Sequence, residues 1–479
     1  MGDRRSSLPV AFDTDTLKSG IGRRRPGRIA LSALVLVAVL AVVAPANGAT
    51  GGANISSPSG QQIQGTTSLG AHWLRMFVPW RAVEPARGQI DQAILTSYEQ
   101  GFRAAGPGTK VILDVVGTPA WESGSADEHM PPANPQDYAA FVSALAQRLA
   151  PWVTAYEIWN EEDDASWWTG GPNPAAYVQL LQATYPAIKA ADPHATVVLG
   201  GLTGNDYPFL EGVYAAGGKG YFDAVGVHTD TACNVLSPYE YLRGPDNRMI
   251  PDSFLAYREV HTVMQANGDE KPIWMTELSW RTTSAVCPEG RWAGQKAEGV
   301  SEEQQATYLR QAYHCLAENP YVQVALWYPL QDEGAVTSGL LRANSSRKPA
   351  WTAMRDYLRD GDKLTESCGN FSGPKLALTS PRNGIRYSGP LPIHVSAQSS
   401  HGVFRIKLLI DGKLIRNYDG NSYPSALSGA LTWQGAKHIA LGRHTLTVMA
   451  YDRQRNVSSQ SITIVHVGKG HGKRRHRKG

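Results

Sequence analysis

The chain has 479 residues, of which 42% are hydrophobic and 18% are charged, a balance that indicates a globular protein of two or three domains and excludes a disordered one. Its formal net charge of +4 arises at the ends, because residues 1–28 and 468–479 hold 13 of the 46 basic residues and only three of the 42 acidic residues. The remaining body has a net charge of −6. This argues against a nucleic-acid-binding protein, which would present a basic face on a folded domain.

The N-terminal segment predicts export. Arginines at 23–25 and at 28 precede an apolar run over residues 29–46, and small residues follow, as in a secretory signal. A retained membrane anchor is the alternative, because the run has about the minimum length of a membrane span. We therefore assign residues 1–49 to a signal peptide or N-terminal membrane anchor. We expect the rest of the chain to be secreted or to lie on the extracellular face of the membrane.

Between about residues 72 and 358, short apolar strands alternate with longer amphipathic helices. This alternation is typical of an α/β fold with a parallel sheet and crossover helices, and eight such units close a TIM barrel. We expect a (β/α)8 barrel over residues 50–370, with a weak first strand near 52–55 and a poorly defined unit in the polar residues 56–70. The other expected strands are residues 72–78, 110–116, 154–158, 196–200, 222–227, 272–276 and 322–327. The expected helices are residues 91–105, 135–149, 174–190, 253–266, 301–317 and 349–357.

A different pattern begins near residue 373. Residues 374–467 contain several short alternating strands separated by turns, which predicts a small Ig-like β-sandwich. Asp411 and Gly412 lie between two apolar runs and predict a hairpin. The basic residues 468–479 cannot bury a core, so we expect a disordered tail. The expected strands are residues 375–378, 391–397, 403–410, 413–415, 438–440, 444–451 and 460–467.

Four cysteines predict two disulfides. Cys233, Cys287, Cys315 and Cys368 form an even set in a chain that we expect to be exported, and three pairings are open. If Cys233 and Cys287 follow neighbouring strands, they can pair across the top of the barrel, which leaves Cys315 to pair with Cys368. Free buried thiols are the alternative. The spacing is not that of a zinc site, and we expect no metal and no cofactor.

Two glutamates occupy matched settings at strand ends. Glu161 ends the run 156–161 and Glu277 ends the run 272–277, each after a short apolar strand. In a parallel barrel, the C-terminal strand ends converge on the open face that carries the chemistry. Facing carboxylates on that face are what cleavage of a glycosidic bond requires. The pair therefore predicts a glycosidase site, although a single glutamate at a strand end is usually solvated surface.

The neighbours of the two glutamates suggest their roles. Asn160 can hydrogen-bond a sugar 2-hydroxyl beside Glu161, which favours Glu161 as the general acid and base. Glu277 is then the nucleophile and must stay ionised, so Glu161 should have the higher pKa. Arg75, at the end of the second strand, is a candidate for the positive charge that keeps Glu277 ionised. The alternative for Arg75 is a salt bridge to a loop.

Other side chains also follow strand ends. His228 ends the sixth strand, where a site role and a structural role are equally open. A metal at His228 and Asp230 is a weaker alternative, because no further ligands gather nearby. Five tryptophans follow strand ends, where aromatic faces stack on sugar rings, and we assign Trp121 and Trp327 among them to substrate binding. The remaining tryptophans that follow strand ends are Trp167, Trp168 and Trp280. The acidic run 162–164 suggests a solvated loop.

These motifs resemble those of clan A glycoside hydrolases. Trp159-Asn160-Glu161 and Thr276-Glu277 are similar to the clan's signatures on the fourth and seventh strands. The resemblance covers roughly residues 70–358 and is strongest to family 39-type β-xylosidases and to cellulase-like members. It implies a retaining (β/α)8 glycosidase with Trp327 at the glycone subsite. Further similarity lies in residues 73–75, 80–88, 117–121 and 222–228.

The sequence departs from the family pattern after two site residues. Glu162 follows Glu161 at a place where proline is common. His228 continues as Thr-Asp, where the family often has Pro-Tyr with a tyrosine that hydrogen-bonds the nucleophile. The role of that tyrosine is therefore unassigned, with Tyr239 and Tyr241 as weak candidates.

The sequence thus predicts a secreted retaining β-glycosidase that acts on a β-linked glycan by double displacement, with carboxyl groups roughly 5–5.5 Å apart. The alternative is a catalytically weak or inactive carbohydrate-binding cell-wall protein on the same barrel. We expect a monomer that binds carbohydrate and no nucleic acid. The N-terminal segment or the basic tail could associate it with a cell wall or membrane surface, and the equally open alternative for the tail is a solvated end. The sugar, the linkage and the choice between exo and endo cleavage stay open.

Overall fold

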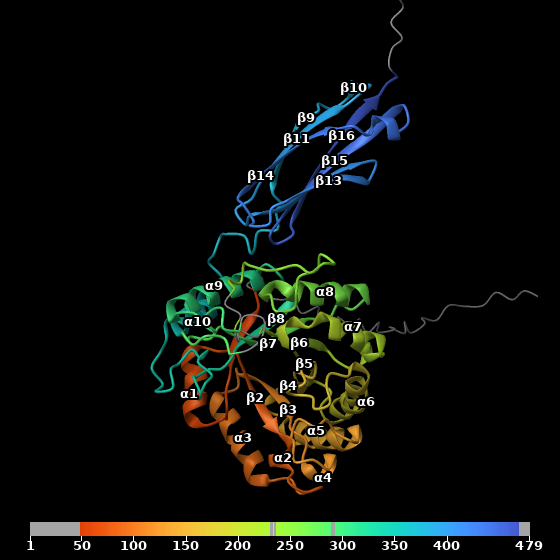
Figure 1. Cartoon of the computed structure of the whole chain (residues 1–479). Helices are drawn as coiled ribbons and strands as arrows, with labels where there is room; N and C mark the ends of the chain where they lie inside the picture. The colour runs from red at the N-terminus through yellow and green to blue at the C-terminus, as the bar shows by residue number, and fades with distance from the viewer. Residues whose placement is uncertain (1–47, 230–232, 234–235, 289–292, 469–479) are drawn as a thin grey trace, which may run out of the picture. The chain divides into compact units, whose positions relative to one another are not determined.

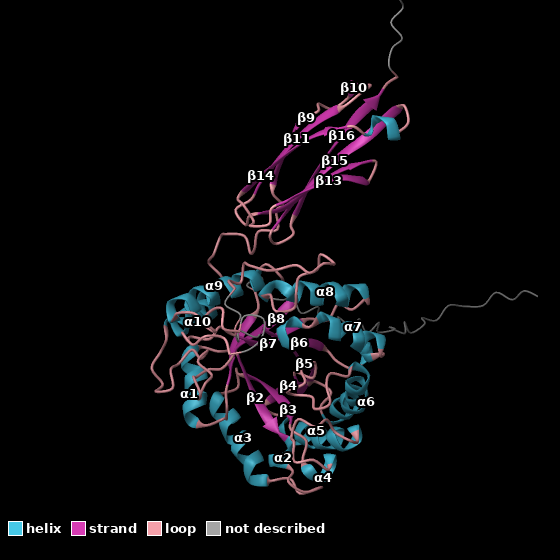
Figure 2. Ribbon diagram, in the orientation of Figure 1, coloured by secondary structure: helices cyan, strands magenta, loops and turns pink. Residues whose placement is uncertain are grey.

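The computed structural model describes residues 48–229, 233, 236–288 and 293–468 (Figure 1). The N-terminal segment up to residue 47 and the basic tail from residue 469, on which two of the predictions fall, lie outside the described residues. Within the described part of the chain, no helix is long and apolar enough to cross a membrane. The regular structure comprises a barrel with its helices and a later group of strands (Figure 2).

Eight parallel strands close the barrel in chain order, and β8 pairs with β1. The predicted (β/α)8 barrel is therefore confirmed, and its weak first strand is present. The strands are β1 (Thr50–Asn54), β2 (Trp73–Pro79), β3 (Lys110–Val116), β4 (Val153–Asn160), β5 (Thr196–Leu202), β6 (Ala224–Thr229), β7 (Ile273–Leu278) and β8 (Val322–Trp327).

Helices surround the strands (Figure 2). Local chemistry explains where several begin: Asn134 and Asn173 cap α5 and α6 through their side chains, and each precedes a proline at the first helical position. The α-helices are α1 (Gly60–Leu69), α2 (Trp80–Val83), α3 (Gln92–Ala105), α4 (Ala120–Ser123), α5 (Pro135–Leu149), α6 (Pro174–Ala191), α7 (Tyr207–Ala215), α8 (Tyr257–Ala266), α9 (Glu302–Ala317) and α10 (Pro349–Asp360). Helix α1 lies in the unit that the sequence left poorly defined, and α7 was not predicted.

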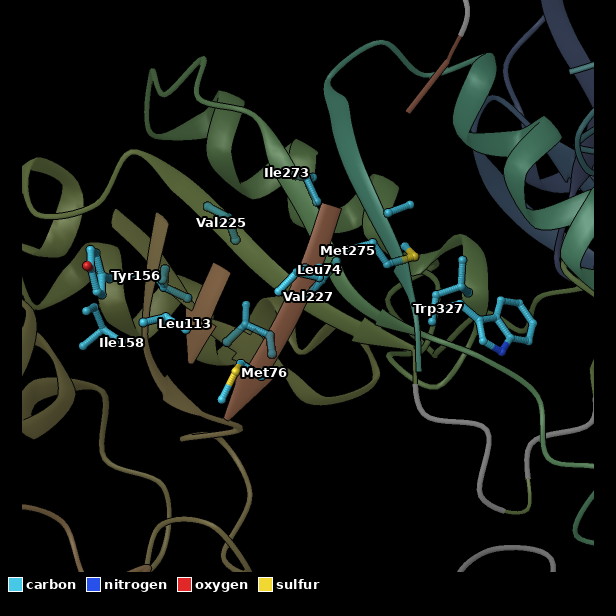
Figure 3. Close-up of a cluster of buried hydrophobic side chains, with 14 of the residues drawn as sticks. Leu74, Met76, Leu113, Tyr156, Ile158, Val225, Val227, Ile273, Met275 and Trp327 are labelled. Atoms are coloured by element: carbon cyan, nitrogen blue, oxygen red, sulfur yellow. The ribbon is translucent and has the colours of Figure 1, made fainter. Parts of the chain in front are cut away.

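Alternate strand residues point to opposite faces, and this alternation builds the barrel core. One set forms a separate apolar cluster that includes Trp73, Ile112 and Ala155. The other set belongs to the main core and includes Leu74 and Leu113 (Figure 3). Residues two positions after Trp73, Ile112 and Ala155 point to the same side of their strands and lie nearer the C-terminal strand ends.

The C-terminal strands form a five-stranded sheet and a three-stranded sheet whose buried residues share one core. The sandwich fold is confirmed, and the predicted hairpin at Asp411 and Gly412 joins β12 to β13. Strands β10 and β14 were not predicted. The prediction of a strand at 438–440 is wrong, because a short 3-10 helix, Gly435–His438, occupies its start. The strands are β9 (Lys375–Ser380), β10 (Ile385–Tyr387), β11 (Leu391–Gln398), β12 (Val403–Ile410), β13 (Lys413–Asp419), β14 (Ala426–Trp433), β15 (Gly442–Asp452) and β16 (Val457–His466).

Two disulfides join the four cysteines. Cys233 pairs with Cys287 across a sequence separation of 54 residues, and Cys315 pairs with Cys368 across 53. Cys233 follows β6 and Cys287 follows β7, so the first bridge joins loops after neighbouring strands. The sequence left three pairings open. The structure contains Cys233–Cys287 with Cys315–Cys368, which is the pairing expected if the loops after β6 and β7 are neighbours.

Candidate active site

A cavity of about 230 Å³ lies at the C-terminal ends of the barrel strands. Glu161, Glu277, Asn160 and His228, all predicted from strand ends, line it together. In a TIM barrel this is the face that carries the chemistry. The other lining residues are Phe77, Trp167, Thr229, Ser279, Arg281, Tyr328, Val336 and Ser338.

The two glutamates approach each other closely, with a histidine between them. One oxygen of Glu161, one of Glu277 and one ring nitrogen of His228 all lie within 4.8 Å of one another. His228 Nδ1 is 2.8 Å from Glu161 Oε1 and 3.9 Å from Glu277 Oε2. The glutamate side chains are 18% and 15% exposed, whereas that of His228 is 1% exposed. Both carboxyl groups can therefore reach a substrate. These three groups could also ligate a metal ion, and the expectation of no metal stays a prediction.

Arg75 lies beneath Glu277, as the sequence suggested. Its fully buried guanidinium donates from Nη1 to Glu277 Oε1 at 2.7 Å. Burial alone would lower the pKa of Arg75, but the nearby carboxylates raise it above its ordinary value. Arg75 is therefore a permanent positive charge at the base of the site. It also donates to Asn54 Oδ1 (2.8 Å), Asp114 Oδ2 (2.6 Å), Glu157 Oε2 (2.5 Å) and Asn160 Oδ1 (3.1 Å).

Strand alternation explains why these charges meet inside the barrel. Arg75, Asp114 and Glu157 each lie two residues after a member of the inner apolar cluster. Residues two apart on a strand share a face, so all three side chains form the next layer of the barrel interior. All three are fully buried. Sequence alone missed Asp114 and Glu157, because their spacing from the apolar cluster becomes informative only once the inward face of each strand is known.

The backbone at the end of β4 is strained around Asn160. Trp159 has φ +70° and Glu161 has φ +49°, both in the left-handed region that non-glycine residues avoid. Such conformations cost on the order of 1–3 kcal/mol each and persist where the surrounding structure enforces them, often at functional sites. On the adjacent β5, a Cβ atom at Gly201 would lie only 1.9 Å from His228 Nε2. The glycine therefore makes room for the imidazole.

The buried layer holds more acid than base. Burial raises the pKa of Glu277, while His228 and Arg75 oppose this shift. Burial also raises the pKa of Asp114 well above its usual range, against the effect of Arg75 and with the charges of Glu157 and Glu277 adding to it. The expectation that Glu161 has a higher pKa than Glu277 stays a prediction.

The two tryptophans assigned to substrate binding from the sequence, Trp121 and Trp327, do not line the cavity. Trp327 is fully buried, and its Nε1 donates to Ser338 O at 2.7 Å. Trp121 packs edge-on against Trp80, and its Nε1 donates to Glu84 O at 2.9 Å. In this structure both indoles hold the loops around the barrel mouth. Their assignment to substrate binding stays a prediction.

The aromatic residues that do line the cavity are Phe77, Trp167 and Tyr328. The rings of Phe77 and Trp167 stack with centroids 5.8 Å apart and planes 8° apart. Tyr328 directly follows β8, and burial raises its pKa, with the charge of Glu277 adding to the effect. The sequence placed Trp167 among the tryptophans that could stack on a sugar ring, but it gave no role to Tyr328, whose signal is its place after Trp327.

The tyrosines proposed from sequence are not at the site. Tyr239 donates its hydroxyl to Glu366 Oε1 at 2.8 Å, and neither Tyr239 nor Tyr241 lines the cavity. The interpretation of 162–164 as a solvated loop is wrong for Glu162, which is fully buried. Burial raises the pKa of Glu162 well above its usual range, so this carboxyl favours the protonated form.

A closed parallel barrel with two neighbouring carboxyl groups at its C-terminal face has the architecture of a glycoside hydrolase. Residues 47–327, more than half of the chain, match the family described as cellulase (glycosyl hydrolase family 5), and the chain belongs to this family. The predicted membership of clan A is thereby confirmed. Residues 374–448 match the bacterial Ig domain family.

Solved structures agree on the fold. A family 39 glycoside hydrolase from Bacteroides cellulosilyticus WH2 is 18% identical, with a TM-score of 0.53 over 81% of this chain and 80% of that one. A GH39 enzyme from Xanthomonas axonopodis pv. citri is 14% identical, with a TM-score of 0.50 over 81% of this chain and 94% of that one. Among curated proteins, no match was found. The protein is thus a glycosidase whose substrate is a carbohydrate.

Proposed function

We propose that the protein is a retaining β-glycosidase with Glu161 as general acid and base and Glu277 as nucleophile. The observation that supports this most is the approach of the two carboxyl groups, with one oxygen of each within 4.8 Å. Carboxyl groups are roughly 5–5.5 Å apart in retaining enzymes and roughly 6.5–9.5 Å apart in inverting ones. The shorter spacing suits direct attack by a carboxylate rather than attack by an intervening water.

The reaction has two displacements. Glu161 donates its proton to the glycosidic oxygen as the bond to the leaving group breaks, and a Glu277 oxygen bonds to the anomeric carbon. Glu161, now ionised, then removes a proton from water, and the resulting hydroxide displaces Glu277 from that carbon. Each displacement inverts the anomeric carbon, so the product retains the configuration of the substrate.

Three neighbours support these steps. Arg75 holds Glu277 Oε1, which leaves the other carboxylate oxygen for attack. Because Asn160 Oδ1 accepts from Arg75, its amide N–H groups can face a sugar 2-hydroxyl. Tyr328 lies on the cavity wall near the charge of Glu277, and we assign to it the role of the tyrosine that the sequence left unassigned.

We also propose that the enzyme is secreted or held on the extracellular face of the membrane and acts on a β-linked glycan of the xylosidase or cellulase type. The two disulfides support export, because such bridges persist in oxidising compartments. A carbohydrate-binding cell-wall protein without turnover is the alternative that the experiment below separates.

The first experiment is a panel of aryl β-glycosides and β-linked polysaccharides with the full-length protein. Glu161→Gln and Glu277→Gln should each lower kcat by at least about 10²-fold. Glu99→Gln, a change at an ion pair with Arg148 outside the cavity, should leave it unchanged. NMR of the first-formed anomer reports retention or inversion. Glycan binding without turnover in all four proteins would establish the binding-protein alternative, and an inverted product would refute the double displacement.

A further inference from the structure

Asp114 and Glu157 are two buried carboxyl groups that the proposed chemistry does not use. Neither lines the cavity, and both are fully buried. Burying carboxyl groups is costly unless they are paired and hydrogen-bonded, and their replacement by apolar residues is often neutral or stabilising. Their presence directly below the catalytic pair therefore points to a role beyond stability.

Both groups hold the same guanidinium. Glu157 Oε2 accepts from Arg75 Nε at 2.5 Å, and Asp114 Oδ2 accepts from Arg75 Nη2 at 2.6 Å. These contacts fix the plane of the guanidinium from two sides. Nη1 is then directed at Glu277 Oε1, 2.7 Å away. The position of the charge beneath the nucleophile is therefore set by β3 and β4.

The two carboxyl groups differ in their remaining oxygen. Glu157 Oε1 accepts a hydrogen bond from Thr276 Oγ1 at 2.7 Å, so both of its oxygens accept, as in a carboxylate anion. Asp114 Oδ1 has no hydrogen-bond partner among the residues that the structure describes. Burial raises the pKa of Asp114 well above its usual range. The hydrogen bonds thus make Glu157 the more fully paired partner of Arg75, while burial favours the uncharged form of Asp114.

We propose that Glu157 is a positioning residue for the nucleophile: it fixes Arg75 and neutralises part of its charge, so that Glu277 stays basic enough to attack. This inference rests on the proposed role of Glu277. An undivided positive charge beside a carboxylate lowers its pKa by about 1–3 units. A less basic carboxylate is also a weaker nucleophile, as the Brønsted relation for attacking groups implies. Because Glu157 neutralises part of the charge of Arg75, the pKa and the nucleophilicity of Glu277 are lowered less.

Other charged groups reach the same atoms and enter the test. Glu157 also lies near His228, whose Nε2 is 4.0 Å from Glu157 Oε1, so the titration of His228 has to be followed in parallel. The groups that face Glu277 are Arg75 from β2, Asp114 from β3, Glu161 after β4, His228 from β6 and Tyr328 after β8. Those that face Glu157 are Arg75 from β2, Asp114 from β3, Glu162 after β4, Tyr138 on α5, Tyr177 on α6 and His228 from β6.

Glu157→Gln tests the proposal, because the amide oxygen still accepts from Arg75 Nε while the charge is removed. We expect the pKa of Glu277 to fall by about one unit. It is read by 13C NMR of carboxyl-labelled glutamate, with the resonance assigned by its loss in Glu277→Gln. In turnover, the acidic limb of the kcat/KM profile should move to lower pH by the same amount, and kcat should fall by about threefold, as a Brønsted coefficient of about 0.4–0.5 implies. Asp114→Asn should shift the limb less, because burial raises the pKa of Asp114 and so favours its uncharged form.

Glu162→Gln is the matched control. It also converts a fully buried carboxyl to an amide, yet Glu162 forms no hydrogen bond with Arg75 within the described ranges. It should leave the pKa of Glu277 unchanged. If Glu157→Gln does not fold, Thr276→Val removes the hydrogen bond to Glu157 and should shift the pKa of Glu277 in the same direction.

An unchanged Glu277 pKa in a folded Glu157→Gln protein, or an equal shift in Glu162→Gln, would overturn the proposal. The NMR titration needs no turnover. It therefore distinguishes a failure of this inference from a failure of the proposed glycosidase mechanism, which the substrate panel tests.

Discussion

Arg75→Met is the change that tests the buried charge layer most directly. Methionine has a similar length but no charge and no donor, so it leaves Asp114, Glu157 and Glu277 without their common cation. Removing one partner of a buried ion pair costs about 3–5 kcal/mol. Five side-chain hydrogen bonds of a fully buried guanidinium are lost together, so we expect the upper part of that range at neutral pH.

The cost should depend on pH with a definite sign. The charge of Arg75 lowers the pKa of both Asp114 and Glu277, against burial. Without it, both folded-state pKa values rise further above the unfolded values near 4. The folded state then binds protons more tightly, so stability is retained at low pH and lost as pH rises through the folded pKa values. The deficit of Arg75→Met should therefore be largest at pH 8 and shrink toward pH 4.5.

Urea unfolding followed by tryptophan fluorescence at the two pH values measures this difference. Among the 13 tryptophans, Trp433 alone falls in the sandwich sequence, so the signal reports on the barrel. Arg148→Met is the control, because Arg148 is 49% exposed and pairs with Glu99 at the surface. Its cost should stay below about 1 kcal/mol at both pH values. An Arg75→Met deficit that equals this control, or that grows on acidification, would refute the buried-layer reasoning.

Three further predictions concern single contacts. Tyr328→Phe should lower kcat about tenfold without changing the melting temperature, because it removes one hydroxyl from the cavity wall; an unchanged kcat would exclude the proposed role. Replacing Cys315 and Cys368 by serine together should cost about 4 kcal/mol in urea unfolding, because a loop of 53 residues is released, and no loss under oxidising conditions would contradict this. Glu162→Gln should have the same free energy of unfolding as the wild type near pH 4.5 and a higher one at pH 8. Burial raises the pKa of Glu162, so the wild type loses stability as the pH rises, whereas the amide does not titrate. A difference that does not change with pH would show that Glu162 does not titrate in this window.

The barrel could be predicted because its strands are short, apolar and regularly spaced. The expected strands at 110–116 and 322–327 coincide with β3 and β8, and Asn-Pro pairs mark the start of two helices. Helix α7 escaped prediction because it has nine residues and is apolar on most sides, which gives no helical period. Strand β14 reads ALSGALTW, and its small residues have low β propensity.

The site could be predicted only as far as strand ends reveal it. Glu161, Glu277 and His228 follow apolar runs, and this position alone brings them to one face. Tyr328 lies at the same face, but its approach to Glu277 depends on where the chain turns after β8. Asp114 lies inside a strand, where alternation allows either face until the register is known.

The buried layer links the chemistry to the stability of the barrel. A barrel interior filled only with apolar residues would be the more stable choice, since replacing buried ion pairs by apolar residues is often neutral or stabilising. Here the layer nearest the site carries Arg75, Asp114 and Glu157 instead, above the apolar cluster. Because both carboxyl groups contact the cation that holds Glu277, any proton taken up by the layer alters the electric field at Glu277, the proposed nucleophile. Glu157→Gln should therefore shift both the pH profile of activity and the pH dependence of stability. Glu162→Gln should shift only the pH dependence of stability.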